Sequence, residues 1–228
     1  MQDRQANVRN KESVPRSGEH AQDEYEQDLE GDGRMDVFDA IKRRRSIRKF
    51  QDKPIPRGLI EEVLVAATLA PSGKNLQPWR FIVLEGDAKQ HVVETMLARA
   101  EALKAAGVNI GSAIHSARIM AQAPAVVLVY DALIKPADDH NGMARLWSLV
   151  NTQSIGAAIQ NMLLAAEAVG LGTLWICDIF VAEEEISSWL GRTDELVAAV
   201  AIGYPDEAPP PRPRKPWQEV TEWRLSLG

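Results

Sequence analysis

Four short apolar runs alternate with longer segments of helical periodicity, and this alternation limits the folds open to the chain. The runs are RFIVL, AVVLVY, TLWICD and LVAAVAI, at residues 80–84, 125–130, 173–178 and 196–202. Such runs of aliphatic, β-branched and aromatic residues are typical of buried strands. Strands interleaved with helices predict a mixed α/β core of two or three layers.

The intervening segments carry helix signals. Asp36 can cap a short helix with Val37, Phe38 and Ile41 on one side. Pro56 suits the first turn of a second helix, whose predicted inward face comprises Leu59, Ile60, Val63, Leu64 and Ala67. Further helices are predicted at residues 87–106, 112–122, 144–169 and 183–190. Gly170 is a natural stop for the long helix before it.

Composition narrows the class of protein. The chain has 228 residues and a formal net charge of −6, which fits one sizeable domain and argues against general nucleic-acid or membrane binding. Cys177 is the only cysteine, so no intramolecular disulfide can form, which fits a reducing cytoplasm. The start of the chain lacks an apolar signal core, so we expect a cytoplasmic protein. The four histidines show no metal-ligand spacing, so we expect no metal.

Residues 1–34 differ from the rest of the chain. They hold nine acidic and five basic residues, and their few apolar side chains follow no period. Such a segment cannot bury enough surface to offset its ordering entropy. We therefore predict that residues 1–34 are a disordered tail, the alternative being upstream sequence before a start at Met35. We predict one domain at 35–228, with an extended arm from about residue 205.

The segment KRRRSIRKF, at residues 42–50, has six cationic residues among nine. It could be a nucleic-acid arm, a solvated helix end or a pocket for an anion. The acidic chain disfavours the first interpretation. Ser46 and Arg48 follow the run in a predicted turn, and Phe50 then anchors the chain. A hydroxyl flanked by guanidinium groups suits a phosphate.

Two other segments could serve the same ligand. In PSGKNLQPW, at residues 71–79, Asn75 and Gln77 each offer a donor and an acceptor, which suits the edge of a heterocycle. The alternative is an ordinary connection between a helix and a strand. PPPRPRKPW, at residues 209–217, is a proline-stiffened stretch that carries Arg212, Arg214 and Lys215. It is either a basic tail or an arm that reaches an anion.

Taken together, five segments resemble the nitroreductase family of flavoproteins, in that family's order. They are RRSIR (44–48), APSGKNLQPWRFIVL (70–84), GLGTLWICD (170–178), IGYPDE (202–207) and PRKPW (213–217). The resemblance implies an α+β fold, with a mixed β-sheet wrapped by helices. It also implies an intertwined homodimer that holds two FMN molecules at its interface.

The resemblance implies a cofactor site in three parts. The phosphate side would be held by Arg44, Arg45, Ser46 and Arg48, with Arg214 and Lys215 returning to it from the arm. The flavin would be lined by Pro71, Ser72 and Asn75, partly from the partner subunit. The strand passing the ring, mainly through its backbone, would be Trp175, Ile176 and Cys177. No catalytic side chain is implied, and we interpret Cys177 as a small packed residue.

The implied activity is electron transfer from NAD(P)H through FMN to a nitroaromatic, quinone or similar acceptor, in a ping-pong order. No GxGxxG follows a predicted strand, so a fixed Rossmann nicotinamide site is not expected. The alternatives are a flavin-binding or redox-sensing module without significant turnover, and a sister activity such as reductive dehalogenation. The basic segment could also be a docking surface for a partner.

Overall fold

The computed structural model of the protein describes residues 35–133 and 144–225. Contacts group Met35–Gly228 into one compact unit. The prediction of a disordered tail concerns residues outside the described ranges, as does the predicted loop at 134–143. The division of the chain at residue 34 stays a prediction.

The described strands form one four-stranded sheet in the order β1-β2-β4-β3. Their bounds are Trp79–Glu85 (β1), Ala125–Asp131 (β2), Gly172–Ile176 (β3) and Glu195–Gly203 (β4). The predicted strands are confirmed to within one or two residues, but every pair of neighbours is antiparallel. The prediction of a mixed sheet was therefore wrong for these strands. The parallel contribution seen in the described residues is a single bridge between Ser46 and Thr173.

The helical connection between β1 and β2 explains the antiparallel pairing. Glu85, at the end of β1, pairs with Ala125, at the start of β2. Between them, α4 (Gly86–Ala105) and α5 (Ala113–Gln122) pack side by side. Two consecutive helices carry the chain out and back to the same end of the sheet, whereas a single crossover helix would reach the other end.

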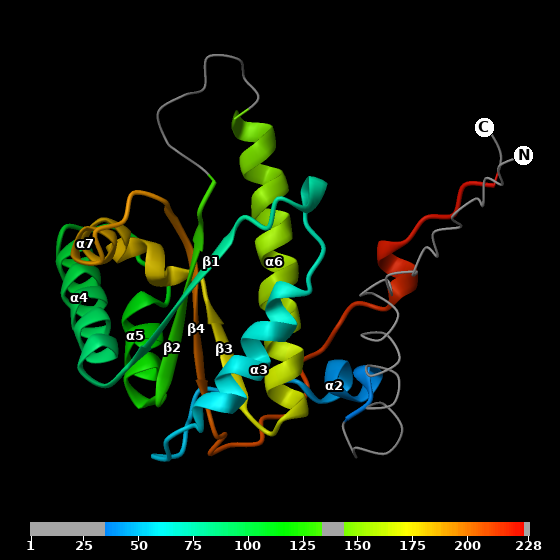
Figure 1. Ribbon diagram of the computed structural model, residues 1–228, viewed down its shortest axis with the longest axis horizontal. Coiled ribbons are helices and arrows are strands. Elements are labelled where there is room, and N and C mark those ends of the chain that lie inside the picture. Colours follow the sequence, from blue (N-terminus) through cyan, green and yellow to red (C-terminus); the bar gives the residue numbers. More distant parts are fainter. Residues whose placement is uncertain (1–34, 134–143, 226–228) are drawn as a thin grey trace, which may run out of the picture. The chain divides into compact units, whose positions relative to one another are not determined.

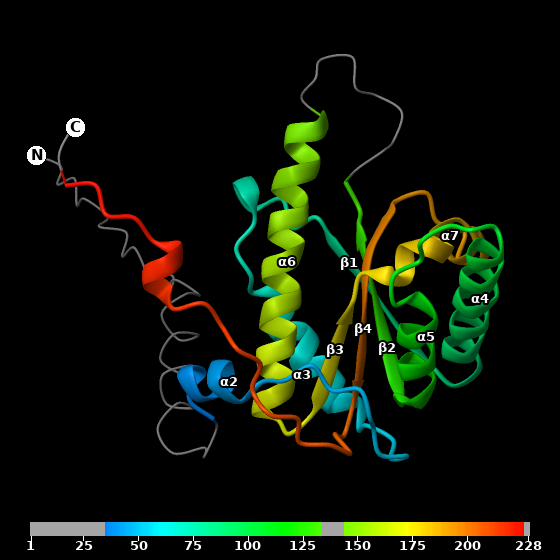
Figure 2. The same ribbon diagram turned by 180° about the vertical axis from the view of Figure 1, so that it is seen from behind.

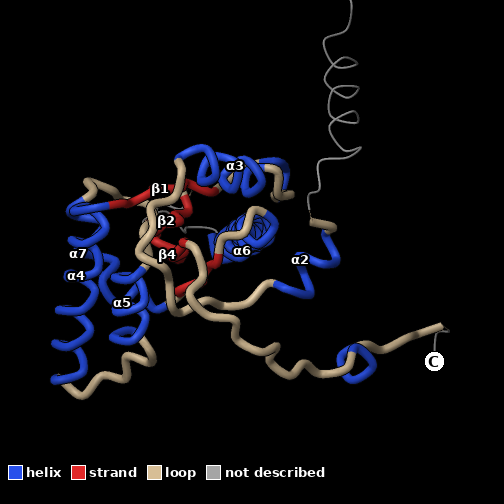
Figure 3. The backbone as a smooth tube through the Cα atoms, turned by 90° about the horizontal axis from the view of Figure 1, so that it is seen from below, coloured by secondary structure: helices blue, strands red, loops and turns tan. Residues whose placement is uncertain are grey.

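Helices cover both faces of the sheet (Figures 1 and 2). One face carries α4, α5 and α7 (Glu183–Trp189); the other carries α3 (Arg57–Thr68) and α6 (Ala144–Ala168). Beyond α6 lies α2 (Val37–Arg43), which contacts that helix (Figure 3). Short 3₁₀ turns complete the described elements: η1 (Gly73–Asn75), η2 (Asp178–Ala182) and η3 (Trp217–Val220).

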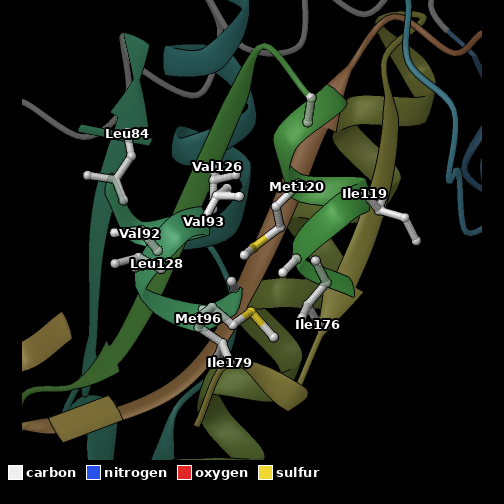
Figure 4. Close-up of a cluster of buried hydrophobic side chains, with 14 of the residues drawn as sticks. Leu84, Val92, Val93, Met96, Ile119, Met120, Val126, Leu128, Ile176 and Ile179 are labelled. Atoms are coloured by element: carbon white, nitrogen blue, oxygen red, sulfur yellow. The ribbon is translucent and has the colours of Figure 1, made fainter. Parts of the chain in front are cut away.

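Two clusters of buried apolar side chains lie on opposite faces of the sheet. The central strands β2 and β4 are therefore buried on both sides. Figure 4 shows the cluster under α4 and α5, where Met96 and Met120 meet Leu128 of β2 and Ile176 of β3. Met96, Met120 and Leu128 are fully buried. Burying a side chain of this size contributes about 1.5–3 kcal/mol, so the cluster holds β3 in place beside the site described below.

Helix ends follow the sequence signals. The Asp36 carboxylate accepts a hydrogen bond from the Phe38 N–H at 2.8 Å, which confirms the predicted cap of α2. Gly170 has a φ of 78° after α6, and the Leu171 N–H donates to the Ala166 carbonyl, as in a Schellman ending. The apolar side of α2 is not packed in the core of the described chain, since Val37, Phe38 and Ile41 are all more than half exposed.

Residues 46–51 are fixed between two segments that are distant in sequence. On one side, the Ile47 N–H donates to the Thr173 carbonyl at 2.9 Å, so the segment covers the open edge of β3. Gly172 permits this approach, because a Cβ at that position would lie 2.7 Å from Ile47 Cγ1. On the other side, Phe50 forms an antiparallel bridge with Pro205.

Candidate functional site

A cavity of about 680 Å³ lies between the basic segment and the C-terminal arm. Among the described residues, six cationic side chains line it and no acidic one does: Lys42, Arg44, Arg45, Arg48, Arg212 and Arg214. Ser46, Ile41 and the prolines at 209–211 and 213 complete its walls. Such a concentration of positive charge without a counter-ion is what an anionic ligand requires.

The basic segment presents its polar side chains to the cavity by alternation. Ser46 and Arg48 line it, whereas Ile47, between them, is buried in the core. The predicted turn at these residues was wrong, because Ser46 forms a bridge with β3. The extended backbone is what places a hydroxyl and a guanidinium on the same side. The predicted anchor, Phe50, is buried as expected.

Arg45 also closes helix α2. Its Nη1 donates to the carbonyl oxygens of Lys42 at 2.6 Å, Arg43 at 3.0 Å and Arg44 at 2.8 Å. These carbonyls belong to the end of the helix, where a cation is favourable. The helix-end interpretation of the basic run therefore holds for this side chain, even though Arg45 borders the cavity.

Among the described residues, the Arg44 side chain has no such hydrogen-bond partners, and it lies near the cations Arg214 and Arg45. Burial lowers the pKa of its guanidinium, and the nearby charges of Arg214 and Arg45 lower it further, against a smaller opposite effect from Glu167. Glu167 lies instead 3.8 Å from Arg43 Nε. Among the cations of the cavity, Lys42 lies 3.8 Å from Asp39 Oδ1, whereas no ion pair within the described residues neutralises Arg44, Arg48 or Arg214. A bound dianion would relieve the repulsion between these arginines.

The amide-rich loop is held in an unusual backbone conformation. Lys74, Asn75 and Gln77 have positive φ angles of 52°, 55° and 48°, although none is glycine. Left-handed conformations of such residues cost about 1–3 kcal/mol each and cluster at functional sites. Ser72 Oγ accepts a hydrogen bond from the Gln77 N–H, which helps to hold the loop. The Asn75 side chain is exposed and available to a ligand.

This loop lies far from the basic cavity of its own chain. The Gly73 N–H donates to Ser154 Oγ, near the middle of α6, while Arg43 approaches Glu167, near its end. The 13 residues from Ser154 to Glu167 span about 20 Å at 1.5 Å per residue. The structure therefore does not bring Pro71, Ser72 and Asn75 together with Arg44 and Ser46 within one chain.

The three residues predicted to pass the flavin ring lie in three different environments. Trp175 is 38% exposed and its ring lies toward Gly156 of α6. Ile176 is buried in the cluster on the other face. Cys177 lies just beyond the end of β3 and is exposed, so its interpretation as a small packed residue was wrong. The chain leaves the sheet at Ile176, two residues before the end of the predicted strand, and this places the thiol outside the core.

Comparison with known proteins decides the family. A sequence model described as the nitroreductase family matches residues 41–204. The chain belongs to the nitroreductase family. Thermus thermophilus NADH dehydrogenase is 31% identical over 209 residues, covering 83% of this chain and 97% of the relative.

Solved structures agree with this membership. A Desulfovibrio desulfuricans protein in complex with FMN is 28% identical, with a TM-score of 0.64, and covers 85% of this chain and 99% of its own. A mutant of NfnB, an FMN and NADPH-dependent nitroreductase from Sphigopyxis sp. strain HMH, is 26% identical, with a TM-score of 0.66, and covers 84% and 100%. The nitroreductase resemblance drawn from the sequence is confirmed.

The arm of this nitroreductase-family chain contributes unequally to the cavity. Arg214 borders it and interacts electrostatically with Arg44, as its place in PRKPW suggested. Lys215 is exposed and lies outside the lining.

The sequence analysis did not predict a role for Glu207, whose carboxylate accepts a hydrogen bond from the Arg48 N–H at 2.5 Å. The IGYPDE motif contained this residue, but only the fold shows which segment it contacts.

Two other features of the described residues bear on the site. No group of three or more His, Cys, Asp or Glu side chains within 35–133 and 144–225 could hold a metal ion. Within the same ranges, no helix has the length and apolarity needed to cross a membrane.

Proposed function

We propose that the protein is an FMN-dependent NAD(P)H oxidoreductase that reduces a nitroaromatic, quinone or similar acceptor. The observation that carries the proposal is the cavity that, within residues 35–133 and 144–225, is lined by six cationic side chains and no acidic one. Family membership, and relatives named for FMN, NADPH and NADH, support the choice of ligand.

The residues present fit a flavin phosphate. Arg44 and Arg48 offer charged donors, and Ser46 offers a hydroxyl from the same side of the segment. Arg214 closes the cavity from the arm. A phosphate that accepts from several of these groups would neutralise the repulsion that now lowers the pKa of Arg44.

We further propose that the complete site belongs to a homodimer. The Asn75 loop and the basic cavity lie about 20 Å apart along α6 within one chain, so a partner's loop is needed to serve this chain's cavity. The exposed apolar side chains supply material for such an interface. They lie on α2 (Val37, Phe38, Ile41), on the arm (Trp217, Val220, Trp223) and on α6 (Leu146, Leu149).

When bound, FMN supplies the redox chemistry, taking a hydride from NAD(P)H and then passing electrons to the acceptor. The protein's part is to hold the phosphate through Arg44, Ser46 and Arg48, and to orient the ring edge through the Asn75 amide. The sequence has no dinucleotide fingerprint for a second, fixed nucleotide site. Donor and acceptor would therefore occupy the same open face in turn, which is a ping-pong order.

An absorbance spectrum of the purified protein tests this proposal. A flavin spectrum is expected, and acid extraction should release FMN. Anaerobic addition of NADH or NADPH should then bleach the flavin band, and an added quinone should restore it. FAD in the extract, or no flavin after reconstitution, would refute the cofactor assignment. A flavin that NAD(P)H does not bleach would refute the oxidoreductase activity and would indicate a flavin-binding module without significant turnover.

A further inference from the structure

Four hydrogen bonds join residues 48–51 to residues 204–207, at the base of the C-terminal arm. The Asp206 N–H donates to the Lys49 carbonyl, and the Gln51 N–H donates to the Tyr204 carbonyl, each at 2.9 Å. Gln51 Nε2 donates to the Pro205 carbonyl at 2.9 Å. The fourth bond, nearest the cavity, runs from the Arg48 N–H to the Glu207 carboxylate.

The use of a side-chain acceptor follows from the sequence of the arm. Prolines 209–211 have no N–H and favour a polyproline conformation, so the ribbon cannot continue as paired backbone. Glu207 is the last residue before the arm leaves the ribbon through Ala208. Its carboxylate supplies the acceptor that further backbone pairing would have provided, and it leaves the arm free to turn toward the cavity.

The stiffness of the arm makes this attachment point important. Glu207 and Arg214 are seven residues apart, which is at most about 22 Å at the polyproline rise of 3.1 Å per residue. For a rod of that length, a tilt of about 20° at its base moves the far end by about 7 Å. Such a displacement would take the Arg214 guanidinium out of hydrogen-bond reach of a ligand held by Arg44.

Glu207 acts on the cavity without bordering it. It is half-buried, lies outside the cavity lining and forms no ion pair with another residue of the described ranges. It lines instead the neighbouring space, with Arg45, Ile47 and Glu167. Its carboxylate accepts a hydrogen bond from the backbone N–H of Arg48. The contact needs an acceptor oxygen at this reach, which a carboxylate or an amide carbonyl can supply.

We propose that Glu207 is a positioning residue of the anion cavity. Its carboxylate fixes the backbone of Arg48 and the direction of the proline arm, so that Arg48 and Arg214 face one ligand together. The identity of that ligand as FMN rests on the proposed function, whereas the contact itself does not.

Two crossed substitutions separate geometry from charge. Glu207→Gln removes the charge but keeps a carbonyl oxygen at the same reach, and Glu207→Asp keeps the charge but shortens the side chain by one methylene. Glu219→Gln, on the exposed η3 turn, is the matched control for lost charge.

Two measurements are made on each variant. FMN affinity is measured by fluorescence titration. Hydrogen exchange of the Arg48 amide is measured on the FMN-free protein, with the Ile47 amide, bonded to Thr173, as internal reference.

Glu207→Asp is expected to weaken FMN binding by about tenfold and to speed exchange at Arg48 by about tenfold, leaving Ile47 unchanged. Glu207→Gln and Glu219→Gln should stay within about threefold of the parent in both measurements. The opposite order of the two Glu207 variants, or no change in either, would overturn the positioning role. If the parent protein fails to bind FMN, the proposed function fails, and the exchange data alone decide the role of Glu207.

Discussion

Arg44→Ala is expected to weaken FMN binding by about ten- to a hundredfold while leaving the fold of the FMN-free protein intact. Hydrogen bonds to charged groups contribute about 1.5–3 kcal/mol, and 1.36 kcal/mol corresponds to one factor of ten. The Arg44 side chain has no hydrogen-bond partner among the described residues that would be lost, and its neighbours Arg214 and Arg45 repel it. Its removal should therefore not lower the melting temperature of the FMN-free protein.

The assay is a fluorescence titration of the FMN-free protein with FMN, at low and high salt. The loss should shrink as salt rises, because partly exposed charges are screened. Arg57→Ala is the matched control, since Arg57 is an exposed arginine paired with Glu61 on α3. Arg45→Ala offers a contrast: it removes three bonds to the end of α2, so it should lower the melting temperature as well.

Equal FMN affinity for Arg44→Ala and the parent protein would refute the assignment of the cavity to a phosphate. The basic run would then be a solvated helix end throughout, as Arg45 already is in part. A loss of affinity that comes with unfolding of the FMN-free protein would instead show that Arg44 is structural.

Three further outcomes are expected. Gly172→Ala should cost about 1–3 kcal/mol of stability, measured by urea unfolding, because its methyl group would meet Ile47; an unchanged midpoint would contradict the close approach of these segments. The thiol of Cys177, although exposed, should be alkylated slowly at pH 8 and faster as the pH rises, since burial and then Asp178 raise its pKa and the thiolate is the nucleophile; a rate already at its plateau at pH 8 would contradict this. Truncation after Tyr204 should reduce flavin content and weaken the dimer together, as seen by light scattering with a flavin absorbance trace; a truncated dimer with undiminished flavin would refute the shared site.

Much of the local structure could be predicted from the sequence. The apolar runs gave the strands to within one or two residues, and Asp36 and Gly170 marked the helix ends where capping chemistry requires them. The basic run and the arm were also predicted to share one anion, and Arg44 and Arg214 do border one cavity. These predictions succeed because periodicity, caps and charge density act over a few residues, and a few residues are what a sequence window contains.

Only the tertiary structure decided the rest. The sequence predicts two helices between β1 and β2, but only the structure shows that α4 and α5 pack together and return the chain to the same end of the sheet, which makes the strands antiparallel. Nor could they show that Cys177 lies outside the core, or that the Asn75 loop lies about 20 Å from the basic cavity of its own chain. The contact between Glu207 and Arg48 joins residues 159 positions apart. Such contacts are set by the packing of the whole sheet, since no local pattern fixes which distant segments will meet.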